Sequence, residues 1–258
     1  MQISIITATY NSAATIADCI ASVNKQISVN IEHIIIDGKS KDNTIELINA
    51  LPNRITNLIS EPDMGIYDAL NKGIQIASGD IIGFLHSDDL FDSAETLFHI
   101  HNTFLQTDAD IVYGDLLYID KKDTEKGIRY WKSQTFKPEL LKRGWMPAHP
   151  TIFMRREVYK KHGLFNISLK CAADYDFILR VFRDKTLSIV YLPEIITKMR
   201  IGGVSTCGIK NIINKKKEDY LVLKNNQMSF PLWILFAKNV SKIPQLIFKN
   251  HKIHKDKS

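Results

Sequence analysis

Strand-like and helix-like patterns alternate through residues 2 to 120, and this alternation constrains the fold more than any other feature. The runs ISIITATY, IEHIIID, ITNLIS, DIIGFL and ADIVYGDLLYID are apolar enough to be buried strands, and a segment with helical spacing follows each of the first four. Short connections between such units require a mostly parallel sheet covered by helices on both faces. We therefore predict an α/β fold.

The chain length favours one large domain with an appendage, since 258 residues can bury a sizeable core. The three cysteines form no CxxC pair, which argues against a disulfide framework or a zinc site and suits a reducing cytoplasm. The first residues enter a strand-like run without a basic leader, so we expect no signal peptide. We predict a catalytic domain over residues 1–205 and an extension over residues 206–258.

The C-terminal extension is strongly basic. From position 205 onward there are eleven lysines and three acidic residues, so this segment carries a formal charge of +8, and the first 204 residues sum to −2. Its uninterrupted apolar run, 230–237, is too short to cross a bilayer, which needs about 20 residues. Lysines mixed with large apolar residues favour an interfacial helix on an anionic membrane surface, with docking onto the catalytic domain or a second subunit as the alternative. The apolar residues are Trp233, Phe236, Ile243 and Phe248.

Three polar clusters follow the apolar runs, at the strand ends where sheets of this kind bind ligands. Because the carboxyl ends of parallel strands meet at one edge, we expect the clusters to converge there. The clusters are Thr7-Thr9-Tyr10-Asn11, Asp37-Gly38-Lys39-Ser40 and Ser87-Asp88-Asp89.

Adjacent carboxylates, Asp88 and Asp89, close the fourth apolar run. Such a pair is costly because like charges repel and burial penalises both. Mg²⁺ and Mn²⁺ prefer hard oxygen ligands and often bind through one or two carboxylates together with substrate phosphates. Neighbours on an extended segment point in opposite directions, so we expect Asp89 to bind the metal and Asp88 to bind sugar or ribose hydroxyls. A turn with a helix N-cap is the alternative.

The first polar cluster does not fit a dinucleotide or a P-loop. The turn TATYNSAAT contains no glycine, and the chain has no GxxxxGK[ST] motif. Its hydroxyls and aromatic ring suit a nucleobase instead. Asp37 could accept a hydrogen bond from a uracil-like N–H or from ribose. DGKSKDNT could also be a tight turn in which Asp42 caps the next helix, and the two interpretations are compatible because Asp37 and Asp42 are five positions apart.

Four motifs in this order resemble the family 2 glycosyltransferases: SIITATYNSAATI, IIIDGKSKDNT, SEPDMGIYDALNKGIQIASGDIIGFLHSDD and ADYDFILR. The resemblance covers roughly residues 2 to 205. It implies a GT-A fold, which is Rossmann-like, and inverting transfer of a sugar from a nucleotide donor. The EPDMGIYDALNKG stretch is especially similar to enzymes that build bacterial polysaccharide or lipopolysaccharide. The Q/RxxRW signature of processive synthases is absent, which favours addition of one sugar per encounter.

The same resemblance implies a set of donor-side residues. Ser87-Asp88-Asp89 becomes this chain's version of the DXD motif, with serine in place of the first aspartate. The lysine at position 72 could equally be a solvated helix residue, and the arginine and serine of RIGGVS could contact phosphate oxygens. The implied residues are Thr7, Thr9, Tyr10, Asp37, Asp63, Asp68, Lys72, Ser87, Asp88, Arg200 and Ser205.

The resemblance also implies a catalytic base, because inverting displacement needs a carboxylate that takes the proton of the acceptor hydroxyl. Family members usually place it in an ED dipeptide. Here Ala173 replaces the glutamate and Asp174 remains, so we assign Asp174 as the base. Asp176 is expected to be a structural cap or a partner of Arg180. His149 is an acceptor-side contact or a histidine packed at the edge of the core.

The sequence thus predicts a metal-dependent, inverting hexosyltransferase that uses Mn²⁺ or Mg²⁺ and a UDP- or GDP-sugar. The acceptor would be a glycan or a lipid-linked glycan in bacterial surface polysaccharide synthesis, and no nucleic acid is expected. The enzyme would be cytoplasmic and peripheral on the inner face of the membrane, with a homodimer left open.

Two alternatives to this function remain. A sugar-nucleotidyltransferase would need a glycine-rich, basic loop that the first turn lacks. A non-catalytic glycan-binding or scaffold subunit is suggested by the lost first aspartate and by Ala173, but the retained aspartates at 37, 88, 89 and 174 oppose it.

Overall fold

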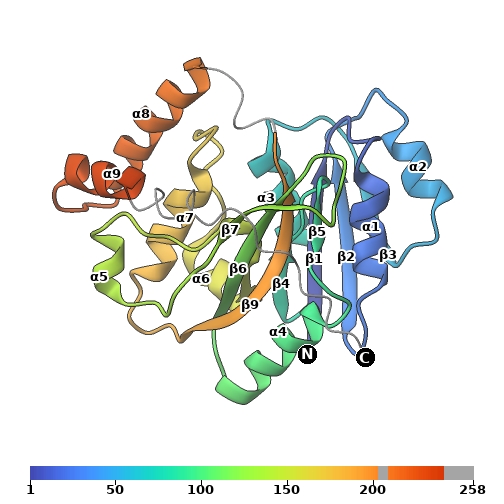
Figure 1. Cartoon of the computed structure of the whole chain (residues 1–258), viewed down its shortest axis with the longest axis horizontal. Coiled ribbons are helices and arrows are strands. Elements are labelled where there is room, and N and C mark those ends of the chain that lie inside the picture. Colours follow the sequence, from blue (N-terminus) through green and yellow to red (C-terminus); the bar gives the residue numbers. More distant parts are fainter. Residues whose placement is uncertain (203–208, 241–258) are drawn as a thin grey trace.

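The computed structural model describes residues 1–202 and 209–240, which form a nine-stranded sheet flanked by helices (Figure 1). The strands are β1 (Gln2–Thr9), β2 (Asn30–Asp37), β3 (Ile55–Ser60), β4 (Ile81–Phe84), β5 (Asp89–Phe91), β6 (Ile111–Ile119), β7 (Gly127–Trp131), β8 (Ile152–Arg155) and β9 (Ile189–Arg200). The helices are α1 (Ile16–Asn24), α2 (Thr44–Ala50), α3 (Ile66–Ile76), α4 (Thr96–Thr107), α5 (Pro138–Leu141), α6 (Arg156–His162), α7 (Ala173–Phe182), α8 (Ile209–Asn225) and α9 (Pro231–Val240), with a 3-10 turn at His149–Thr151.

The N-terminal half of the sheet is parallel, as predicted. Strand order begins β3-β2-β1-β4, and each neighbouring pair in this part runs parallel. Thr9 lies opposite Asp37, and Asp37 lies opposite Ser60. The carboxyl ends of these strands therefore meet at one edge of the sheet, where the polar clusters follow them.

The C-terminal half mixes directions. β8 lies antiparallel between β4 and β6, β9 runs parallel to β6, and β5 pairs antiparallel with β9. The prediction did not include β5, because a strand of three residues is too short to show a periodicity. This strand places Asp89 opposite Met199, so the acid pair contacts a segment far along the chain.

Helices cover both faces of the sheet because successive strand residues point to opposite sides. On β1, Ile5 belongs to a cluster with residues of α1 and α4, and Ile6 belongs to a cluster with residues of α3 and α7. The second cluster also contains Val222, Leu223 and Ile234 from α8 and α9. The described part of the C-terminal extension therefore docks onto the catalytic domain, which was the alternative interpretation.

The predicted domain boundary at residue 205 and the apolar residues Ile243 and Phe248 lie outside the described residues. No helix in residues 1–202 or 209–240 combines the length and the hydropathy that a membrane crossing requires.

A buried carboxylate, Glu32 on β2, joins the amino ends of the parallel strands. It accepts hydrogen bonds from Oγ of Ser4 (2.5 Å), Oγ and N–H of Ser78 (2.7 and 2.8 Å) and N–H of Gly79 (3.3 Å). Burial opposes ionisation of Glu32, but these hydrogen bonds outweigh it, and the pKa lies below its usual value.

We expect Glu32→Ala to lower the free energy of unfolding by about 3 kcal/mol at pH 7, because several buried donors lose their acceptor. A lowered folded-state pKa stabilises the fold fully above the ordinary glutamate pKa, and this contribution is lost as pH falls through the folded-state value. Urea unfolding at pH 7 and at successively lower pH measures both effects. Glu157→Ala, which removes an exposed carboxylate on α6, is the control; equal losses in the two variants would contradict the prediction.

Candidate active site

Two loops at the carboxyl edge of the sheet hold one another in place. The N–H of Asn11 donates to Oγ of Ser40 at 2.8 Å, and the N–H of Lys41 donates to Oδ1 of Asn11 at 2.8 Å. The N–H of Ser12 donates to Oγ1 of Thr44 at 2.8 Å. Between these anchors the ring of Tyr10 is 54% exposed, which leaves a face for stacking.

The carboxylate of Asp37 is fully buried and organises this edge. It accepts hydrogen bonds from N–H and Oγ of Ser40 (2.9 and 2.5 Å) and from Oγ of Ser60 (2.6 Å). Asp42 holds the turn before α2 by accepting from N–H and Oγ1 of Thr44 (3.1 and 2.5 Å). DGKSKDNT therefore forms a tight turn, but the N-cap residue of α2 is Asn43 and not Asp42. The hydrogen bonds of Asp37 to these serines shape the loop.

Gly38 lies where three loops approach one another. A Cβ atom at this position would lie 2.5 Å from Oδ2 of Asp63 and 3.4 Å from Cδ2 of Tyr10. Glycine thus permits Asp63 and Tyr10 to face the same point at the rim. The sequence prediction did not single out Gly38, although a glycine directly after a strand-ending aspartate was the available signal.

The two threonines of β1 point into the protein. Thr7 is fully buried, and its Oγ1 lies 3.1 Å from Nε2 of His33. Thr9 is 4% exposed, and its Oγ1 makes no hydrogen bond to a described residue. Of the predicted base- and ribose-binding residues, Tyr10 therefore has the most open position.

Asp68 and Lys72 on α3 support the segment that carries Asp63. Nζ of Lys72 lies 2.8 Å from Oε1 of Glu61 and 3.6 Å from Oδ2 of Asp68, and it donates to the carbonyl of Pro62 at 3.0 Å. The hydrogen bond to Glu61 is the main reason that the pKa of Lys72 is raised. Lys72 is thus held by two carboxylates and a main-chain carbonyl and is not a freely solvated lysine.

The acid turn after β4 is fixed from two sides. Oγ of Ser87 lies 2.8 Å from Oγ of Ser12, which joins the turn to the first loop. The Arg200 side chain, only 5% exposed, donates to the carbonyl of Asp88 at 2.8 Å and pairs with Asp18 at 2.5 Å. In this structure the guanidinium predicted to contact diphosphate holds the main chain of the turn. Ser205, the other predicted phosphate contact, lies outside the described residues.

The two acids of this turn occupy different environments. Asp89 is completely buried, and neither of its carboxylate oxygens has a hydrogen-bond partner among the described residues. Burial raises its pKa well above the usual range, and the charge of Asp88 adds to the shift. Asp88 is partly exposed. The carboxylate with access to a ligand is therefore that of Asp88.

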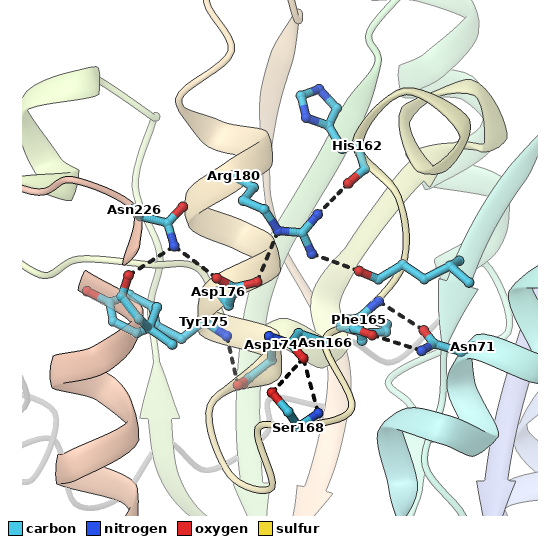
Figure 2. Close-up of polar contacts among 12 residues, drawn as sticks. Asn71, His162, Phe165, Asn166, Ser168, Asp174, Tyr175, Asp176, Arg180 and Asn226 are labelled. Carbon is cyan, nitrogen blue, oxygen red and sulfur yellow. Dashed lines mark hydrogen bonds and ion pairs between the residues drawn. The ribbon is translucent and has the colours of Figure 1, made fainter. Parts of the chain in front are cut away.

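Asp174 lies in the first turn of α7, and its charge acts on His86, the residue before the acid turn. Oδ1 of Asp174 accepts a hydrogen bond from the hydroxyl of Tyr67 at 3.2 Å. The same oxygen accepts from the N–H of Tyr175 at 2.8 Å (Figure 2). Burial lowers the pKa of His86, and the charges of Asp88 and Asp174 both oppose that shift. The carboxylates of Asp88 and Asp174 thus both favour the charged form of His86.

His149 packs at the edge of the core, which is one of the two interpretations offered for it. Its ring stacks on Phe84, with centroids 5.3 Å apart, and meets the edge of Phe165 at 5.5 Å, as a core-edge residue does. The ring also lies 6.1 Å from that of His86 and is partly exposed. Burial lowers the pKa of His149 to about 4, so the imidazole is neutral near pH 7 and can hydrogen-bond a hydroxyl group.

Two residues of α3 that the sequence did not indicate contact the region of the candidate base. Asn71 exchanges two 2.9 Å hydrogen bonds with the main chain of Phe165, and Tyr67 reaches Asp174. Each of them directly precedes a charged residue, Asp68 or Lys72, which the sequence prediction selected instead. Their i, i+4 spacing on the inward side of the helix was the signal that could have identified them.

Comparison with known proteins agrees with this geometry. The glycosyl transferase family 2 model matches residues 4–163. A PGL/p-HBAD biosynthesis glycosyltransferase of Mycobacterium tuberculosis is 31% identical over 207 residues, covering 78% of each chain. An uncharacterized glycosyltransferase of Rickettsia typhi is 28% identical over 256 residues, covering 96% of this chain and 75% of the relative.

Solved glycosyltransferases share the fold. S. aureus TarS 1–349 in complex with UDP-GlcNAc aligns with a TM-score of 0.66 at 18% identity, covering 96% of this chain and 79% of that one. Against a longer TarS structure the chain spans only 39% of the length, with a TM-score of 0.65. The mannosyltransferase PcManGT from Pyrobaculum calidifontis in complex with GDP-Man and Mn²⁺ aligns with a TM-score of 0.64 at 17% identity, covering 94% and 70%. The chain described here therefore belongs to glycosyl transferase family 2 and is a glycosyltransferase with the GT-A fold.

Proposed function

We propose that this enzyme transfers one sugar, with inversion, from a UDP- or GDP-sugar to a glycan or lipid-linked acceptor in bacterial surface polysaccharide synthesis. The observation that carries the proposal is the environment of Asp174. Tyr67 and the main chain hold its Oδ1, and its Oδ2 has no hydrogen bond to a described residue. Burial and the charge of Asp174 raise the pKa of Tyr67, so its hydroxyl remains a donor.

The reaction follows from this arrangement. Oδ2 of Asp174 takes the proton of the acceptor hydroxyl while the hydroxyl oxygen bonds to the anomeric carbon of the donor. The bond from that carbon to the phosphate oxygen breaks, and the nucleoside diphosphate leaves with the electron pair. Attack opposite the leaving group inverts the anomeric configuration, and no covalent enzyme intermediate is needed.

The donor-side residues fit a nucleotide sugar and a divalent cation. Tyr10 offers an exposed ring beside Gly38 and Asp63, which suits a nucleobase and its ribose. The partly exposed carboxylate of Asp88 is a hard-oxygen ligand, and Mn²⁺ or Mg²⁺ commonly takes one or two such ligands with phosphates completing its shell. When bound, the cation would stabilise the negative charge of the departing diphosphate. Asp88 fits this role better than Asp89, which is completely buried.

A screen of UDP-, GDP- and dTDP-sugars, with and without Mn²⁺, tests the proposal. We expect one donor to raise the melting temperature in a Mn²⁺-dependent manner and to be hydrolysed slowly with water as the acceptor. Preference for a nucleoside triphosphate would instead indicate a sugar-nucleotidyltransferase. Binding of no nucleotide would indicate a non-catalytic subunit.

We also propose that the enzyme is cytoplasmic and contacts the anionic inner surface of the membrane through α9. Four large apolar residues around this helix are exposed, and lysines of α8 are exposed nearby in the sequence. Aromatic residues mixed with basic ones are typical of interfacial helices. Such contact would hold the enzyme at the surface where a lipid-linked acceptor lies. The exposed apolar residues are Phe230, Leu232, Trp233 and Phe236.

Trp233→Ser combined with Phe236→Ser is expected to lower binding to vesicles of anionic phospholipid about tenfold or more in a flotation assay. Deleting the whole tail would be a poor test, because Ile234 belongs to the core. Leu105→Ser, which changes an exposed leucine on α4, is the control. Unchanged flotation would exclude this membrane contact, and a change only in oligomeric state would assign the surface to a second copy of the chain.

A further inference from the structure

We infer that Glu218 of α8 is a positioning residue for the catalytic base, because its carboxylate fixes the chain that leads directly into Asp174. This inference rests on the proposed function, in which Asp174 is the base. It assigns a role in catalysis to the C-terminal helices, whose sequence suggested an interfacial helix on a membrane or a helix docked onto protein.

Glu218 binds three successive main-chain N–H groups. Its Oε1 accepts from Lys170 at 3.1 Å, and its Oε2 accepts from Cys171 at 2.7 Å and from Ala172 at 3.0 Å. These residues immediately precede α7, in which Asp174 is the second residue. One carboxylate thus holds the three residues that lead into the helix, from a position 46 residues beyond Ala172.

The start of α7 lacks a cap of its own. Helices begin with N–H groups that have no partner inside the helix, and a side chain at the N-cap usually binds one of them. Here the N-cap residue is Ala172, which has no side-chain acceptor. Glu218 instead binds the N–H of this N-cap residue and of the two residues before it, and its negative charge lies where the helix dipole favours one.

Further contacts from α9 and from Asn226, the residue directly after α8, hold the residues that follow the base. Nδ2 of Asn226 donates to Oδ1 of Asp176 at 2.9 Å, and the other oxygen of Asp176 pairs with Nε of Arg180 at 3.0 Å (Figure 2). The prediction that Asp176 is the partner of Arg180 is thereby confirmed. Nζ of Lys238 lies 3.5 Å from the ring centroid of Tyr175.

The α8–α9 pair therefore contacts the main chain or side chains on both sides of Asp174. Tyr67 alone among the described side chains bonds the carboxylate itself, so the direction of Asp174 depends on where the first turn of α7 lies relative to α3. Displacement of a reacting group by about 1 Å can cost roughly 10²-fold in rate. Loss of Glu218 should accordingly affect the chemical step more than donor binding.

The test compares Glu218→Ala and Glu218→Gln with Lys217→Ala, which alters the neighbouring, exposed residue of α8. The readout is release of nucleoside diphosphate from the donor selected by the screen, with water as the acceptor. We expect Glu218→Ala to lower kcat about 10- to 100-fold with donor KM within about twofold of the unaltered protein. Glu218→Gln keeps one acceptor oxygen, so its kcat should be intermediate. Lys217→Ala should match the unaltered protein.

A double-mutant cycle with Asp174→Asn separates positioning from a purely structural role. If Glu218 acts through the base, Glu218→Ala lowers kcat no further when Asp174 is already asparagine. Equal falls in both backgrounds, or a kcat for both Glu218 variants within twofold of the unaltered protein, would overturn the inference. If Glu218→Ala does not fold, the same cycle is run with Glu218→Gln. Full activity of Asp174→Asn alone would instead remove the proposed base, so the two failures are distinguishable.

Discussion

Asp174→Asn is expected to lower sugar transfer about 10³-fold while donor affinity stays within about twofold, since general base catalysis contributes 10²- to 10⁴-fold. The amide keeps the size of the side chain and can still accept from Tyr67, so the fold and the local hydrogen bond are retained. What disappears is the group that takes the proton of the acceptor. Donor hydrolysis kinetics and calorimetric titration of the donor measure the two quantities separately.

Glu157→Gln is the control for this change, because it removes an exposed carboxylate on α6 whose ion-pair partner is Lys160. Its kcat should equal that of the unaltered enzyme. A kcat for Asp174→Asn within tenfold of that value would mean that another group accepts the proton.

Asp88→Asn is expected to lower transfer by about 10²-fold or more and to remove the dependence of donor binding on Mn²⁺. The partly exposed Asp88 carboxylate can reach a cation that is shared with a diphosphate. Asp89→Asn should cost less than tenfold, because that side chain is completely buried and its raised pKa favours the neutral acid. Mn²⁺ titrations of donor binding in both variants measure the difference.

The opposite ranking would restore the assignment made from the sequence, in which Asp89 binds the metal. The melting temperatures of the two variants without Mn²⁺ serve as the control. An unchanged melting temperature means that a loss of donor binding does not come from a general loss of stability.

The sequence predicted the parallel half of the fold because its signals are local. Apolar runs such as IEHIIID and the helical spacing after them are visible within ten to fifteen residues, and parallel pairing then brings the strand ends to one edge. The convergence of Tyr10 and Asp63 at that edge follows from the same rule.

The remainder of the site depends on contacts between distant residues. Strand alternation indicates that the side chains of Asp88 and Asp89 point in opposite directions. Which of the two points inward depends on the pairing of β5 with β9, a distant segment of the chain. Tyr67 and Asp174 are 107 positions apart, and Ala172 and Glu218 are 46 positions apart, so neither contact leaves a periodic pattern in the sequence. The sequence prediction selected Lys72 because a charged residue is easily recognised in a sequence. It missed the neighbouring Asn71, because a hydrogen bond to the main chain of Phe165 cannot be recognised there.

The pairing of β5 with β9 has a consequence for biosynthesis. Arg200 binds the carbonyl of Asp88 from a position 112 residues later, so the acid turn gains this support only after β9 has been synthesised. Contacts of this separation close late, because the intervening loop must first be ordered. A nascent chain that has emerged from the ribosome only as far as β4 contains the four parallel strands β1 to β4, but it has no finished turn for the acid pair.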